Sequence, residues 1–139
     1  MKPSRFGLDA WISSALMAGL TLSVFALLRS YGPESAIRQF HLAAVGGDAA
    51  DLQRVTSQPI DQPAVQTLAG LVKDIARQNG SFQLGKVERS SRIVTATVQY
   101  EIPGRRPATT VWVVQKPGDE TRWKVNAEET LIKMRRLGF

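Results

Sequence analysis

The sequence predicts an α+β protein in which an apolar N-terminal helix precedes one small domain. Residues 8–28 are almost free of charge, which sets them apart from the rest of the chain. Apolar residues then recur at helical spacing as far as residue 78, and from Ser81 they recur at every second position. Because the helices precede the strands, we expect a four-stranded antiparallel sheet that curls around the longest helix, residues 64–78.

Residues 8–28, LDAWISSALMAGLTLSVFALL, have the length and composition of a transmembrane helix, with one charge at Asp9. At about 1.5 Å of rise per residue such a helix covers about 30 Å, the thickness of the bilayer hydrocarbon. Its apolar side chains surround the helix axis, which suits lipid better than the surface of a soluble domain. Trp11 and Tyr31 lie near its two ends, where aromatic rings favour the headgroup layer.

The charges that flank this stretch predict its orientation. Lys2 and Arg5 precede it, and this modest basic excess favours a cytoplasmic N-terminus. We therefore expect residues 1–7 in the cytoplasm, residues 8–29 across the inner (plasma) membrane, and residues 30–139 as an extracytoplasmic domain. The absence of cysteine is compatible with an oxidising compartment.

Two other interpretations of the apolar stretch remain open. A signal peptide would need a small-residue cleavage site after a shorter apolar core, but Leu28 and Arg29 stand where small residues are required. A buried soluble helix is the third alternative. If the helix does span the membrane, the small residues Ala15, Gly19 and Ser23 would let another helix approach closely, although such residues are common in membrane helices.

The first two helices of the domain are predicted from their start and stop signals. Pro33 begins the first, and Gly46 and Gly47 end it. Asp48 is expected to cap a second helix over residues 49–55, with Leu52 and Val55 facing inward. The expected inward face of the first helix consists of Ile37, Phe40, Ala44 and Val45.

Residues 64–78 form the clearest amphipathic pattern, which Asn79 and Gly80 end. We expect this helix to pack on the sheet through Val65, Leu68, Leu71, Val72 and Ile75. The strands are expected at residues 81–88, 92–102, 108–116 and 121–126. Trp112 and Trp123 should be buried, and Asn126 should cap a short helix in the tail with Glu129 three residues on.

Two short segments carry a resemblance to a known family. AAVGGDAADLQRV, residues 43–55, and RWKV, residues 122–125, resemble parts of nuclear-transport-factor-two-like domains, which have a cone-shaped, cystatin-like α+β fold. The resemblance implies a small cone-like domain of about three helices packed on a curved four-stranded antiparallel sheet. Many members place a short strand between the second and third helices, and TSQPIDQP, residues 56–63, offers little for one. The family includes enzymes, ligand binders and interaction modules, so the resemblance leaves function open.

Composition argues against most catalytic chemistry. With one histidine and no cysteine, no motif with metal-ligand spacing is present, so we expect no metal and no cofactor. No G-x-S-x-G nucleophile elbow and no phosphate-binding loop occur in the predicted domain. The net charge is +6, but the basic residues are scattered, which does not favour nucleic acid as a partner.

Five residues are candidates for a functional site. Pocket enzymes of the resembling family use an Asp or His inside the cone, which makes His41, Tyr100 and Trp112 a candidate pocket, with an ordinary core as the alternative. Arg105 and Arg106 lie in a predicted turn and are candidates for docking a partner, with a solvated turn as the alternative.

These observations together favour a single-pass membrane protein that is not an enzyme. We expect its exported domain to be a protein-interaction module, an accessory or assembly subunit of a membrane complex. The alternative is a tethered protein that binds a small apolar ligand, with or without turnover. An open cavity would favour the alternative, and a filled one would favour the interaction module.

Overall fold

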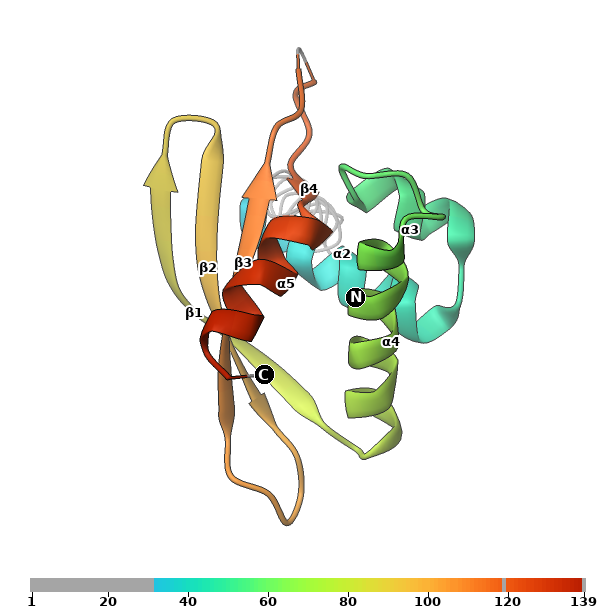
Figure 1. Ribbon diagram of the computed structural model, residues 1–139, viewed down its shortest axis with the longest axis vertical. Helices are drawn as coiled ribbons and strands as arrows, with labels where there is room; N and C mark the ends of the chain where they lie inside the picture. Colours follow the sequence, from blue (N-terminus) through green and yellow to red (C-terminus); the bar gives the residue numbers. More distant parts are fainter. Residues whose placement is uncertain (1–31, 119, 139) are drawn as a thin grey trace, which may run out of the picture. The chain divides into compact units, whose positions relative to one another are not determined.

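Helices come first and strands second in the computed structural model, which describes residues 32–118 and 120–138 (Figure 1). The described elements are α2 (Pro33–Gly46), α3 (Ala49–Val55), α4 (Pro63–Arg77), β1 (Ser81–Ser90), β2 (Ile93–Glu101), β3 (Ala108–Gln115), β4 (Lys124–Val125) and α5 (Ala127–Arg136). The prediction of an α+β fold with a four-stranded antiparallel sheet is confirmed.

The predicted membrane helix, residues 8–29, lies outside the described residues, as do Ala15, Gly19 and Ser23. Of the helices between Gly32 and Gly138 that the structure describes, none is both long and apolar enough to cross a membrane.

The predicted helix ends are confirmed by their local contacts. Proline occupies the first turn of α2, and Gly47 ends that helix with a φ of 69°, a left-handed conformation that glycine adopts without strain. The side chain of Asp48 accepts hydrogen bonds from the backbone N–H groups at the start of α3. Asn126 caps α5 by accepting from the backbone N–H of Glu129 at 3.1 Å.

The strands follow one another in space as they do in sequence, in the order β1-β2-β3-β4. Period-two alternation in β2 places one face toward the helices, and there Tyr100 lies opposite Phe82 and Ala96 lies opposite Trp112. The buried residues on this face of β2 are Val94, Ala96, Val98 and Tyr100, as the alternation predicts.

The last strand is shorter than the sequence predicts, and α5 continues the contacts with β3 beyond its end. Beyond β4, the backbone N–H of Asn126 donates to the carbonyl of Val113 at 2.8 Å. The Thr130 hydroxyl then accepts from the N–H of Val113 at 3.0 Å. The start of α5 therefore satisfies the edge of β3 beyond the end of β4, whereas residues 121–123 of the predicted strand lie before the observed one.

The segment after α3 takes part in the sheet more than expected. Thr56 forms an isolated parallel bridge with Val125, and the N–H of Ser57 donates to the carbonyl of Val125 at 2.9 Å. The side chain of Gln58 bonds to Asn126 and to the N–H of Ala127. In residues 56–63, where the sequence offers little for a strand, Thr56 therefore forms a single bridge to the sheet.

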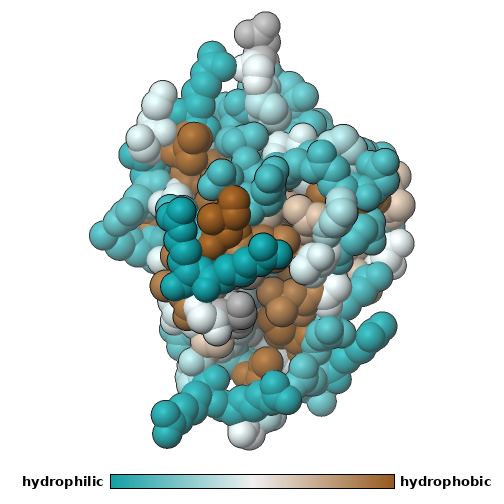
Figure 2. Space-filling model, viewed as in Figure 1, coloured by the Kyte–Doolittle hydropathy of each residue, from teal (hydrophilic) through white to brown (hydrophobic). Residues whose placement is uncertain are grey.

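The long helix α4 packs mainly on α2 and α5, which in turn contact β3. Figure 1 shows α2 and α5 between the sheet and α4. The expectation that α4 packs directly on the sheet is therefore wrong, because the C-terminal helix occupies that space. Figure 2 shows apolar surface gathered over α5 and between α5 and α4, the helices that carry the half-buried Leu131 and Leu71.

Three expected core positions need correction. Leu71 is only half-buried, and the smaller Ala69 is buried in its place because α4 turns that side toward its neighbouring helices. Val45 is 54 % exposed, since α2 buries His41 and Ala44 on a stripe that Val45 misses. Trp112 is fully buried as expected, whereas Trp123 is half-buried with the Lys116 ammonium 4.8 Å from its ring.

Candidate functional site

The three candidate pocket residues meet in space, although they come from three different elements. His41 lies on α2, Tyr100 on β2 and Trp112 on β3. The His41 ring centroid is 5.7 Å from that of Tyr100 and 4.7 Å from that of Trp112. Phe82 of β1, which the sequence did not single out, stacks on His41 at 3.9 Å, and we call these four residues the aromatic cluster.

Two hydrogen bonds fix the state of the His41 ring. Its Nδ1 lies 2.7 Å from the carbonyl oxygen of Ile37, which can only accept, so Nδ1 carries the proton. Its Nε2 lies 2.7 Å from the Tyr100 hydroxyl, and in the neutral ring this nitrogen accepts from the O–H. The neutral imidazole is therefore held on both sides without any water or ligand.

Burial shifts the pKa values of both titratable groups toward their neutral forms. Desolvation lowers the pKa of His41 from 6.5 to about 4, although the hydrogen bond to Ile37 acts in the opposite direction. Desolvation raises the pKa of the Tyr100 hydroxyl above its usual value. Near neutral pH the cluster is uncharged.

The aromatic cluster is closely packed. His41 is 5 % exposed, while Tyr100 and Trp112 are almost completely buried. The lone pair that His41 would use as a base is already bonded to Tyr100, and Phe82 stacks on its ring. A substrate could reach this nitrogen only after the cluster opens. The indole Nε1 of Trp112 is buried without a hydrogen-bond partner in the described part of the chain.

Arg105 and Arg106 lie in the exposed turn between β2 and β3, the strands that carry Tyr100 and Trp112. Gly104 has a φ of 78°, which favours glycine, and the N–H of Arg105 donates to the carbonyl of Ile102 at 3.0 Å. No ion pair joins either guanidinium to another residue among those described. Both side chains can therefore meet a partner from solvent.

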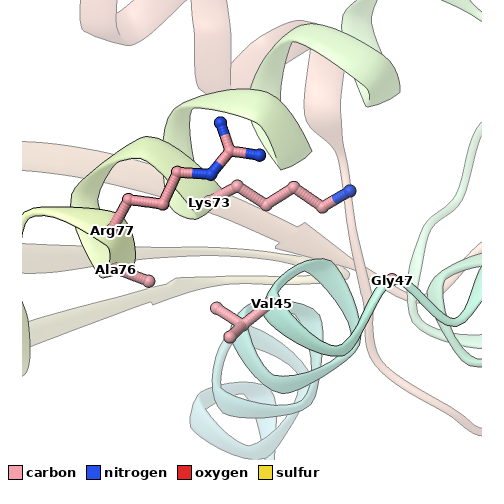
Figure 3. Close-up of a pocket in the computed structure, with 5 residues that line it drawn as sticks. All are labelled: Val45, Gly47, Lys73, Ala76 and Arg77. Carbon is pink, nitrogen blue, oxygen red and sulfur yellow. The ribbon is translucent and has the colours of Figure 1, made fainter.

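A third feature is a hollow of about 390 Å³ between α2 and α4, which sequence reasoning missed (Figure 3). It is lined by Val45, Gly47, Lys73, Ala76 and Arg77. The signal was present in the four-residue spacing of Lys73 and Arg77, which places both on one side of a helix. It was missed because Val45 was assigned to the core.

Among residues 32–118 and 120–138, no three His, Cys, Asp or Glu side chains gather in a way that could hold a metal ion.

Comparison with known proteins gives no identification. No model of a known family matches the chain, and no curated protein matches it.

Proposed function

We propose that this protein is a single-pass membrane protein whose extracytoplasmic domain is a protein-interaction module, an accessory or assembly subunit of a membrane complex. The tight packing of His41 against Tyr100, Trp112 and Phe82 carries this proposal. Aromatic rings fill the part of the domain where a pocket enzyme would hold its substrate. The domain then acts through its surface, where a partner protein can bind. The apolar stretch at residues 8–28 would hold the domain at the bilayer.

The same packing supports a cone-like, nuclear-transport-factor-two-like domain whose interior is filled by the side chains of the aromatic cluster. Helices followed by an antiparallel meander agree with that resemblance, and the bridge between Thr56 and Val125 reduces its main departure. The relationship stays a proposal, because a shared order of elements is compatible with many functions.

The proposed docking site is the turn that carries Arg105 and Arg106. Two adjacent guanidiniums on an exposed turn can each form paired hydrogen bonds with a carboxylate, so the partner surface is expected to be acidic. Charge complementarity of this kind contributes mostly to specificity and to the rate of association.

Charge reversal tests this docking site. Arg105→Glu/Arg106→Glu in the tagged full chain is expected to lower recovery of the partner from mild-detergent extracts at least about tenfold, because like charges placed opposite each other repel. The matched control is Arg135→Glu/Arg136→Glu, a second exposed arginine pair, on α5. The control should recover the partner as the unmodified chain does, with both variants folded by circular dichroism.

Binding of a small apolar ligand inside the domain is the second candidate. It is favoured by the buried indole N–H of Trp112, which has no hydrogen-bond partner among the described residues and lies in the aromatic cluster with His41 and Tyr100. If His41→Ala abolishes cellular function while the arginine reversal leaves partner recovery unchanged, the interaction module is wrong and the pocket should replace it.

A further inference from the structure

The outer side of α2 exposes two apolar residues that are not part of the core. Leu42 is 74 % exposed and Val45 is 54 % exposed. They are three residues apart on one helix, so they lie on the same side of it, and the exposed Arg38 lies one turn before Leu42. The other large exposed apolar residues of the described chain lie elsewhere: Ile93 begins β2, and Leu137 follows α5.

Basic side chains border these apolar residues. Val45 shares the hollow between α2 and α4 with Lys73 and Arg77, whose long side chains extend over it (Figure 3). The nearby carboxylate of Asp74 contacts Arg77 at 3.5 Å, but both groups are mostly exposed, and such a pair contributes little. We call Arg38, Leu42, Val45, Lys73 and Arg77 the basic-apolar face.

The position of this face along the chain indicates what could cover it. The apolar stretch ends at Leu28, and α2 begins at Pro33. The four residues between them reach at most about 14 Å when fully extended. If residues 8–28 cross a bilayer, the first turn of α2 lies close to the headgroups, and the rest of that short helix can lie along the surface.

We propose that the basic-apolar face docks on a bilayer that contains anionic phospholipid, an inference that rests on the membrane attachment proposed above. Leu42 and Val45 enter the boundary between headgroups and acyl chains, as the apolar side of an interfacial helix does. Arg38, Lys73 and Arg77 contact the lipid phosphates, and long basic side chains suit this role because their stems are apolar and their ends are charged. Docking would fix the orientation of the domain relative to the membrane.

The chain contains no cysteine, so a single introduced cysteine can carry a polarity-sensitive NBD fluorophore. The full chain with Leu42→Cys is labelled and placed in nanodiscs of phosphatidylcholine with or without phosphatidylglycerol. Its emission is expected to shift to shorter wavelength only in the anionic discs, and high salt should reverse the shift. The same label at Ile93→Cys, on β2, should not respond, although Ile93 is also exposed.

The basic residues are tested in the same labelled chain. Each lysine or arginine near an anionic surface contributes about fivefold, so Lys73→Gln/Arg77→Gln should lower the ratio of docked to undocked protein about 25-fold. The control Arg135→Gln/Arg136→Gln removes an exposed arginine pair elsewhere and should leave the shift intact. An unchanged spectrum in anionic discs, an equal shift in neutral discs, or a shift that requires an added membrane protein would each overturn the proposal.

Failure of membrane attachment by residues 8–28 can be distinguished from failure of docking by the basic-apolar face. If the chain does not enter nanodiscs, membrane attachment by residues 8–28 is wrong. The labelled chain is then mixed with vesicles of the same two compositions. A shift with anionic vesicles alone still supports the basic-apolar face, and no shift with either overturns it.

Discussion

Replacing Leu68 with alanine is expected to lower the free energy of unfolding by about 2–5 kcal/mol. Leu68 is fully buried on α4 within the main apolar core. Removing its side chain both loses burial and leaves a cavity, in a domain whose whole stability is expected to be only about 5–15 kcal/mol. Urea unfolding of the full chain in mild detergent, followed by tryptophan fluorescence, measures the loss.

The matched control is Leu42→Ala, which removes the same atoms from the interior of another helix, where the side chain is 74 % exposed. It should change the free energy of unfolding by no more than about 0.5 kcal/mol. Leu71→Ala should fall between the two, because that side chain is half-buried. A loss below about 1 kcal/mol for Leu68→Ala would mean that α4 turns another face toward the core.

Mild acid is expected to destabilise the domain through His41. Its pKa in the folded domain is about 4, below the value of about 6.5 in the unfolded chain. Below pH 6.5 the unfolded chain therefore binds a proton that the folded domain refuses, so stability falls as the pH decreases toward 4. Between pH 7 and pH 5 the expected loss is about 2 kcal/mol.

His41 is the single histidine of the chain, which makes its share of the pH dependence separable. In His41→Phe/Tyr100→Phe both hydrogen-bonding partners become apolar groups of similar shape, so neither is left buried without a partner. Urea unfolding at pH 7 and pH 5 should show a smaller loss for this variant than for the unmodified chain. An equal loss in both proteins would mean that His41 is accessible to protons in the folded domain.

The sequence was sufficient for the order of the elements and for the starts of α2, α3 and α5, because local signals determine both. Pro33, Asp48 and Asn126 act on neighbouring backbone groups, so their roles are visible without the tertiary structure. The alternation in β2 likewise predicts its buried face. Each of these signals depends on residues at most a few positions apart.

The errors arose where distant segments compete for one surface. The sequence does not show that α5 packs on β3, or that Asn126 and Thr130 hydrogen-bond to the backbone of Val113 beyond β4. Val45 was wrongly assigned to the buried side of α2 because helical periodicity alone defines that side to within about one residue. The stacking of Phe82 on His41 depends on strand register and could not be read locally.

The central claim is that residues 8–28 hold a folded domain at the membrane, and intact-mass analysis of carbonate-washed membranes tests it most directly. The chain is expected to stay in the membrane pellet and to retain residues 8–28. Leu20→Arg should release part of it, because an arginine near the centre of a membrane helix costs about 2.5–3.5 kcal/mol on insertion scales. A soluble chain that begins after Ser30 would contradict the account, since the stretch would then be a cleaved signal peptide.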